Sequence, residues 1–194
     1  PYFDMKKYLM AWLGNTDLRA VTDEEKIGLG PVAQAVVARN FERLVLLSKY
    51  GEEEVDAYLN WLKTKKDILV TVRSVQLTSP TDFGEIYQAV RATLEAIKSQ
   101  HGADLSFTFH LSPGTPAMAA VWILLAKSIY PAELLESSRE QGVKTAVIPF
   151  DISAEFIPAL LKGADDRLEK LSAGPPPDAP EFSEIVHRSP VMQQ

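Results

Sequence analysis

Apolar positions follow two different periods along most of the chain, and the way these periods alternate predicts a strand–helix repeat. Continuous apolar runs favour buried strands, whereas apolar residues spaced three or four apart favour helices packed by one face. The strand-like runs are residues 5–13, 41–47, 68–77 and 105–111. The helix-like segments are residues 30–39, 52–66, 83–101 and 117–129. Residues 14–17 have the composition of a turn, and residues 18–29 show no period and are expected to form a loop.

Two further strand-like runs, residues 132–137 and 143–150, follow with only about five residues between them. A parallel crossover needs a dozen or more residues, so this pair is predicted to be an antiparallel hairpin. The expected fold class is therefore α/β. It is a Rossmann-like, mostly parallel sheet in the order 3-2-1-4-5-6, with helices on both faces and a terminal antiparallel β-hairpin.

The predicted domain does not account for the two ends of the sequence. Residues 1–4 precede the first methionine and are interpreted as a remnant of expression cloning, and residues 5–171 are expected to form the domain. Residues 172–181 contain three consecutive prolines, a composition typical of a semi-rigid linker. Residues 182–194 are too few to fold alone, so the sequence is interpreted as a fragment that stops at the start of a further module.

Composition excludes several classes of function. The chain has no cysteine and three histidines, so we expect neither a disulfide nor a metal site, and no cofactor in this fragment. The net charge is −6 without a long run of Lys or Arg, which argues against non-specific binding to duplex nucleic acid. No apolar run is long enough for a membrane span, so we expect no membrane partner and a cytoplasmic location.

The turn between the strand 105–111 and the helix 117–129 is the strongest candidate for a binding site. Gly114 can adopt a positive φ and lets a ligand approach the backbone closely. Thr115 is a good N-cap, and Pro116 suits the first helical position. The free N–H groups and the positive end of the helix dipole then favour phosphate or carboxylate. Alternatively, the turn is only a tight, well-capped connection.

In the predicted strand order, the first and fourth strands are adjacent, and ligands of such sheets bind at the carboxyl ends of the strands there. The segments after these two strands should therefore face each other, with the end of the fifth strand on the same rim. Residues 15–17 could instead form a simple turn, and Arg139 a solvated side chain. The candidate ligand-binding residues are Gly14, Asn15, Thr16, Asp17, Arg19, Ser112, Pro113, Gly114, Thr115, Pro116, Met118, Ser137 and Arg139.

The helix 117–129 is apolar on all sides, so its far face needs a cover beyond the sheet. The C-terminal segment of the same chain is one candidate cover. A symmetric homodimer through this helix is the one that we favour.

Enzyme motifs are absent or incomplete. The dinucleotide fingerprint fails because only Gly14 follows the first strand, and the phosphate-binding P-loop is missing. Ser112 sits where a hydrolase nucleophile would, but His110 replaces the first glycine of the Gly-x-Ser-x-Gly motif. We therefore assign no catalytic residue and expect this fragment not to be an enzyme.

The residues around this turn carry a specific resemblance. Residues 109–118 (FHLSPGTPAM), 122–126 (WILLA) and 130–134 (YPAEL), with Ser137 and Ser138, resemble the CRISPR-associated Rossmann fold (CARF) domain. More narrowly, they resemble that domain at the N-terminus of sigma-54-dependent transcriptional activators related to the RNA-repair regulator RtcR. The resemblance covers residues 5–161 and is strongest from 77 to 161. Residues 182–192 resemble the lead-in to the AAA+ ATPase module of such activators.

The resemblance implies a dimerising ligand sensor. Its ligand would be cyclic oligoadenylate or an RNA with a terminal 2′,3′-cyclic phosphate, bound by Ser112 to Thr115 with Met118 and by Asn15, Thr16 and Asp17. The full-length protein would be an ATPase that acts on sigma-54 RNA polymerase and DNA. Many CARF domains carry Lys or Arg where Pro116 stands in this chain. Two alternatives are a CARF domain that cleaves cyclic oligoadenylate and an oligomerisation module without a ligand.

Overall fold

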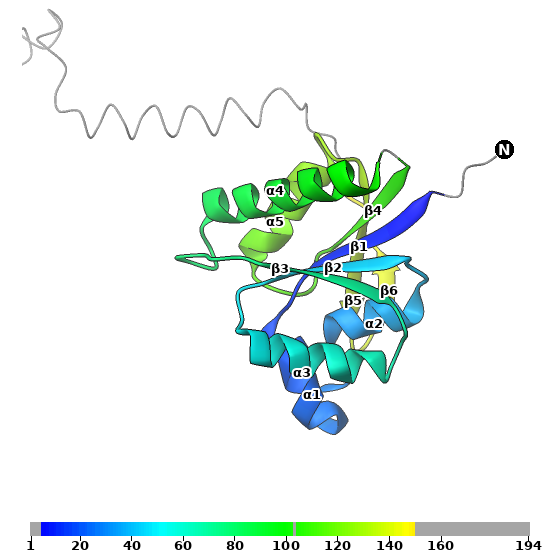
Figure 1. Ribbon diagram of the computed structural model, residues 1–194. Coiled ribbons are helices and arrows are strands. Elements are labelled where there is room, and N and C mark those ends of the chain that lie inside the picture. Colours follow the sequence, from blue (N-terminus) through cyan, green and yellow to red (C-terminus); the bar gives the residue numbers. More distant parts are fainter. Residues whose placement is uncertain (1–4, 103, 150–194) are drawn as a thin grey trace, which may run out of the picture. The chain divides into compact units, whose positions relative to one another are not determined.

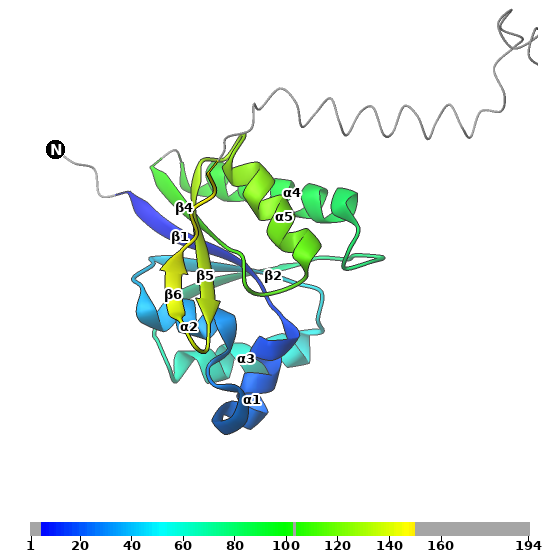
Figure 2. The same ribbon diagram turned by 180° about the vertical axis from the view of Figure 1, so that it is seen from behind.

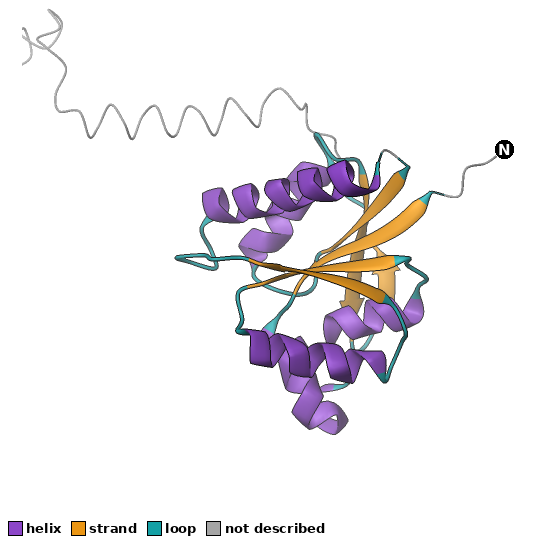
Figure 3. Ribbon diagram, viewed as in Figure 1, coloured by secondary structure: helices purple, strands orange, loops and turns teal. Residues whose placement is uncertain are grey.

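The computed structural model of the chain describes residues 5–102 and 104–149 and forms a six-stranded sheet between two layers of helices (Figure 1, Figure 3). The strands are β1 (Lys6–Trp12), β2 (Arg43–Ser48), β3 (Leu69–Ser74), β4 (Leu105–His110), β5 (Ala132–Ser138) and β6 (Gly142–Thr145). The helices of this described part are α1 (Asn15–Ile27), α2 (Gly30–Ala38), α3 (Glu52–Lys63), α4 (Phe83–His101) and α5 (Pro116–Ala126).

The sheet topology confirms the predicted fold class. The strand order is β3-β2-β1-β4-β5-β6, and every neighbouring pair is parallel except the antiparallel hairpin of β5 and β6. Because β1 lies between β2 and β4, the chain reverses its direction of winding there. The gap between the carboxyl ends of β1 and β4 is thus the switch point of the sheet.

Helices α1, α2 and α3 cover one face of the sheet, and α4 and α5 cover the other (Figures 1 and 2). The first layer packs on alternate strand residues such as Leu9 and Leu46, which are fully buried. On the other face, the rings of Phe109 and Trp122 lie 4.5 Å apart between centroids. Each fully buried side chain of this size stabilises the fold by about 1.5–3 kcal/mol, so both layers are firmly held.

One predicted segment was wrong. Residues 14–29, expected to be a turn and a loop, contain helix α1. Its buried residues are Asp17 and Ala20, so its sequence shows no apolar stripe, and a non-helical backbone at Asp23 interrupts it further. Helix α1 is held at its first turn by a carboxylate, a device that hydrophobic periodicity does not reveal.

Smaller differences lie at the ends of elements. Strand β3 ends at Ser74 and β6 at Thr145, earlier than the predicted limits of 77 and 150. Four predictions concern residues outside the described part of the chain: those for residues 1–4, 150–171, 172–181 and 182–194. Within the described ranges, no helix is long and apolar enough to cross a membrane. No group of three or more His, Cys, Asp or Glu side chains there could hold a metal ion.

Candidate ligand-binding site

Helices α1 and α5 begin beside each other at the switch point, directly after β1 and β4. A Cβ atom built on Gly14 would lie 3.2 Å from the backbone nitrogen of Gly114 and 3.6 Å from Cβ of Pro113. A side chain at position 14 would therefore separate the two segments. The structure thus brings together the two turns that the sequence places at the sheet's carboxyl edge.

The start of α5 is capped by uncharged groups. Oγ1 of Thr115 accepts a hydrogen bond from the Met118 N–H (3.3 Å) and donates one to the carbonyl of Pro80 (2.7 Å). The Thr115 N–H points at Sδ of Met118, 3.4 Å away. Pro116 is the first residue of α5, as predicted. These contacts fix Thr115 and Met118 as parts of the turn itself.

Gly114 is the residue on which this turn depends. Its φ is +93°, a region that side-chain-bearing residues rarely adopt. A Cβ atom here would lie 2.6 Å from Sδ of Met118 and 3.3 Å from Cβ of Trp12. The thioether of Met118 therefore occupies the space beneath the glycine, and the exposed side of Gly114 is backbone.

The start of α1 is held by Asp17, whose carboxylate is completely buried. Its Oδ2 accepts a hydrogen bond from the Gly14 N–H (3.1 Å), and its Oδ1 accepts one from the Val32 N–H in the first turn of α2 (2.8 Å). One side chain thereby fixes two helix N-termini. Because both oxygens are engaged and enclosed, Asp17 supports the site from below and is not placed to touch a ligand directly.

Burial raises the pKa of the Asp17 carboxyl from 3.8 to about 7, although the hydrogen bonds from Val32 and Gly14 lower it. The carboxyl group therefore exchanges its proton near neutral pH. Tyr50 and Tyr58 are the titratable neighbours that sense it. Burial raises the pKa of both, and the Asp17 charge raises it further, at Tyr50 after a larger contribution from the Glu54 charge.

The first N–H groups of a helix have no partner within the helix. At the start of α1, the Asp17 carboxylate accepts from the Gly14 N–H but not from the N–H groups of Asn15 and Thr16. The side chains of both residues are exposed. These two N–H groups lie at the positive end of the α1 dipole, in the turn that directly follows Gly14, the neighbour of Gly114. An anion placed there would be bound by backbone donors.

Ser112 and Ser137 join β5 to the turn after β4. Oγ of Ser112 accepts a hydrogen bond from the Ser137 N–H (2.7 Å), which leaves the Ser112 hydroxyl hydrogen available. Oγ of Ser137 lies 3.1 Å from the carbonyl of Pro31, to which it donates, and 2.8 Å from Nε2 of His110. These hydrogen bonds connect the ends of β4 and β5 to the start of α2.

His110 is fully buried, and burial lowers its pKa from 6.5 to about 3, so its imidazole is neutral. Because the Ser137 hydroxyl donates to Pro31, Nε2 of His110 carries the hydrogen and donates to Ser137. Nδ1 of His110 has no hydrogen-bond partner in the described part of the chain. His110 therefore positions Ser137 and is enclosed too fully to act on a ligand.

A hollow of about 450 Å³ opens beside Ser112 and Ser137, between α5 and the β5–β6 hairpin. Of its hairpin side, the sequence predicted Ser137 but not the others, because the strand pattern does not show which polar residues of a hairpin turn back toward a helix. Among its walls, Lys144 donates to Oε1 of Gln141 (2.7 Å) and lies 3.6 Å from a carboxylate oxygen of Glu136. The residues that line it are Leu111, Ser112, Ala119, Ile123, Glu136, Ser137, Ser138, Glu140, Gln141, Gly142 and Lys144.

Of the two arginines proposed for the site, Arg139 makes its contact away from the start of α1. Nη1 of Arg139 donates to the carbonyl of Lys26 (2.6 Å), near the C-terminal end of α1. This contact is eleven residues along the chain from Asn15, beyond the non-helical backbone at Asp23. Arg19 is exposed on the second turn of the same helix. Where Gly14 and Gly114 meet, the site therefore presents backbone and hydroxyl groups, and Lys144, in the wall of the adjoining hollow, is engaged with Gln141 and Glu136.

Three further residues that support the site were not predicted from the sequence, and they lie outside α1 and α5. Pro80 anchors the Thr115 hydroxyl, Val32 takes the second oxygen of Asp17, and Pro31 accepts from Ser137. Each contact joins residues far apart in sequence, so no local motif marks it. The sequence did contain one local signal, Asp17 three residues after Gly14, which is the spacing of a helix-capping carboxylate.

No protein-family model and no curated protein sequence matches the chain. Solved structures do match. Csm6 from Enterococcus italicus, bound to cyclic hexa-2′-fluoro-hexa-dAMP, is 16% identical with a TM-score of 0.60 over 82% of this chain and 44% of that chain. Can2 from Sulfobacillus thermosulfidooxidans, in complex with cyclic tetra-adenylate, is 13% identical with a TM-score of 0.52 over 72% and 34%.

A third match, protein VC1899 from Vibrio cholerae, is 11% identical with a TM-score of 0.52 over 74% of this chain and 34% of that chain. The chain therefore spans less than half the length of each of these structures. At such identities the likeness establishes the fold: the chain is a Rossmann-like α/β domain of the kind found in these larger proteins.

Proposed function

We propose that this domain is a CARF sensor that binds an RNA-type phosphodiester at the switch point between β1 and β4. The observation that carries the proposal is the convergence of two helix N-termini, those of α1 and α5, where Gly14 and Gly114 lie side by side. Two proteins of the same fold were solved with cyclic oligonucleotides, which supports this ligand class. The candidate ligands are cyclic oligoadenylate and an RNA end with a 2′,3′-cyclic phosphate.

In this proposal the phosphate oxygens accept hydrogen bonds from the Asn15 and Thr16 N–H groups and from the Ser112 hydroxyl. The exposed backbone of Gly114 allows close approach. With Pro116 at the start of α5, binding depends on oriented dipoles and hydrogen bonds instead of a cation. The ligand then extends into the hollow beside Ser137.

A homodimer through α5 belongs to the same proposal. The outward face of this helix carries Ala119, Ala120, Ile123 and Leu124, which are only half buried in the described part of the chain. Ala119 and Ile123 also line the 450 Å³ hollow. A second copy packed on this face would cover the apolar side chains and complete the wall of the hollow.

The wider role that we propose is that of an N-terminal regulatory domain of a sigma-54-dependent transcriptional activator. The likeness of residues 182–192 to the start of an AAA+ module supports this part. Ligand binding at the switch point would control that ATPase. A Walker A motif in the sequence after Gln194 would support this role, and its absence would contradict it.

Calorimetry with cyclic tri-, tetra- and hexa-adenylate, and with RNAs that end in a cyclic phosphate, tests the ligand class. We expect one of them to bind and the Thr16→Glu variant to bind it at least about tenfold more weakly, because a carboxylate then faces the phosphate. Thr22→Glu makes the same charge change six residues later on α1 and serves as the matched control.

The control variant should keep the affinity of the wild type within about twofold. Binding of none of these ligands, or an equal loss in both variants, would overturn the proposed site. Chromatography of the ligand after incubation with the domain separates sensing from cleavage, since a sensor leaves the ligand intact.

A further inference from the structure

The two edges of the sheet are protected very differently. Strand β6 has four residues and carries Lys144. Strand β3 has six residues, pairs with β2 in unbroken register and contains neither Lys nor Pro, and its one charged residue is Arg73. Leu69 at its start is 58% exposed. Short length, lysine, proline and bulges are the usual means of preventing edge-to-edge pairing, so β3 is an open edge in the described part of the chain.

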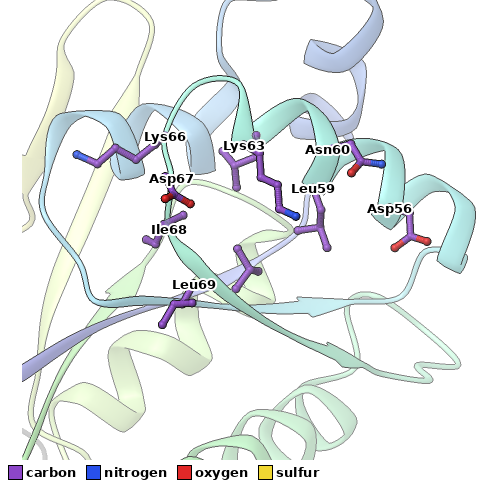
Figure 4. A pocket seen from close by; sticks show the side chains of 10 residues that line it. Asp56, Leu59, Asn60, Lys63, Lys66, Asp67, Ile68 and Leu69 are labelled. Atoms are coloured by element: carbon purple, nitrogen blue, oxygen red, sulfur yellow. The ribbon is translucent and has the colours of Figure 1, made fainter.

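A groove follows β3 on the α3 side. Figure 4 shows its first part, a hollow of about 620 Å³ between α3 and the start of β3, with Leu59, Asn60 and Lys63 above Leu69. A second hollow of about 340 Å³ continues it toward Ser74. Both are lined by Asp56 and Leu59, so together they extend along the whole strand.

The opposite face of β3 is open as well. A hollow of about 370 Å³ lies between the end of β3 and small side chains of α4, among them Ala89 and Ala92. Arg73 lines it, and the buried Nε of this residue has no hydrogen-bond partner among the described residues. An added strand would therefore meet free space on both faces of the sheet.

Helix α3 carries acidic side chains in its first half and a lysine at its end. If a second copy of α3 ran in the opposite direction beside it, opposite charges would face each other. On α3, Glu52 and Asp56 precede Leu59, and Lys63 follows it. Lys66 and Asp67, a pair of opposite charges just after α3, also line the end near Leu69. Leu59, halfway between Asp56 and Lys63, lines both hollows and so lies level with the middle of β3. A second copy turned by a two-fold axis through that point would place its Lys63 opposite Asp56, and its Asp56 opposite Lys63.

Standard spacings agree with this arrangement. Helix α3 packs over β2 and β3, through Tyr58 and Leu62 against residues such as Leu46 and Val70. If β3 pairs with β3 of a second copy at a strand spacing of about 4.8 Å, the two α3 helices lie about 10 Å apart. Helices in direct contact have interaxial distances of about 8–10 Å, so the strands and the helices can make contact together.

We propose that β3 pairs antiparallel with β3 of a second copy of this chain, so that the sheet continues across a two-fold axis and α3 packs against α3. The occupant of the groove is then the α3 helix and the edge strand of that copy. This interface is separate from α5 and independent of any ligand. With the α5 contact, it would allow assemblies larger than a dimer.

Sedimentation of the 194-residue chain tests the proposal, in a background that carries Ala120→Glu to remove the α5 contact. We expect a concentration-dependent dimer. Asp56→Lys should weaken it at least about tenfold, because each of two symmetric attractive pairs becomes repulsive. The double variant Asp56→Lys with Lys63→Asp restores both pairs in reversed polarity, and it should restore the dimer.

Leu69→Lys supplies a second variant, at an exposed position of the edge strand, and we expect it to weaken the same dimer. Circular dichroism of each variant checks that the fold is intact. A background chain that stays monomeric at millimolar concentration would overturn the proposal, whether the groove is empty or filled by another segment of the chain. A double variant that fails to regain the dimer would overturn it too.

Discussion

Helices α1 and α5 start side by side at the same edge of the sheet, yet their N-termini are held by opposite kinds of chemistry. At α5 the cap is the Thr115 hydroxyl with the Met118 thioether, which carry no charge. At α1 it is the buried carboxyl of Asp17, which also holds the start of α2. An anion at this edge therefore meets a neutral cap on one side and a titrating one on the other.

This difference makes the two halves of the site respond differently to pH. The Thr115 cap has no proton to gain between pH 4 and 8. The Asp17 carboxyl, with a pKa of about 7, is close to half protonated at neutral pH. A phosphate bound above Gly14 would favour its protonated form, because the two negative charges repel each other.

The largest expected effect is the pH dependence of stability that Asp17 causes. Its folded pKa of about 7 lies above the ordinary 3.8, so its contribution is fully present below about pH 3.8 and is lost as pH rises through 7. The loss should reach about 4 kcal/mol in the free energy of unfolding. Urea unfolding of wild type and Asp17→Asn at pH 4 to 8 measures it.

The asparagine variant cannot titrate, so the difference between the two proteins should change across this range. Thr115→Ala, at the neutral cap, should give a difference from wild type that is independent of pH. A constant difference for Asp17→Asn would show that the carboxyl is ionised throughout.

The next effect concerns Gly114→Ala at the α5 turn. We expect a loss of about 2–3 kcal/mol, since alanine is strained at a φ of +93° and its Cβ meets Met118 Sδ at 2.6 Å. Gly142→Ala is the control, because Gly142 also has a positive φ, +68°, but nothing lies within 4 Å of its Cβ position. Equal losses in both variants would mean that Met118 moves aside freely.

Removal of the neutral cap itself should cost less. Thr115→Ala leaves the Met118 N–H and the Pro80 carbonyl without their partner, and we expect a loss of about 1–2 kcal/mol. Thr115→Ser keeps the hydroxyl and should lose less than half of that. If serine proves as costly as alanine, then the methyl group, and not the cap, stabilises the turn.

The smallest effect is expected at the far end of α1. Arg139→Ala removes one exposed hydrogen bond to the Lys26 carbonyl and a favourable charge near a helix C-terminus. The loss should be at most about 0.5 kcal/mol. Thermal unfolding checks it, and calorimetry should show ligand affinity unchanged. An affinity loss would place Arg139 closer to the ligand than its contact with Lys26 implies.

The same comparison explains what the sequence could reveal. The strands and their order were predictable, since a parallel sheet buries both faces and its strands are continuous apolar runs. The start of α5 was predictable as well, because Thr115 and Pro116 are local signals. Helix α1 was missed because it buries little apolar surface and starts at a carboxylate contact rather than a hydroxyl cap.

The same limit applied to the roles of single residues: local contacts could be predicted, and long-range hydrogen bonds could not. Asp17 was expected at the site, but its bond to Val32 spans 15 residues and could not be read from the sequence. Arg139 was expected at the rim, and its partner Lys26 lies 113 residues away. Long-range hydrogen bonds of buried polar groups depend on how layers pack, which periodicity does not encode.

The bond from Val32 to Asp17 also gives the molecule a natural reporter. The Val32 amide lies in the first turn of α2, where helical N–H groups ordinarily exchange quickly with solvent, yet it is enclosed and held by a side chain of another helix. We expect its hydrogen exchange to depend on the contact with Asp17, and so on the protonation of that carboxyl, more than on the fraying of α2. A single amide resonance could thus record events at the neighbouring helix without any label placed there.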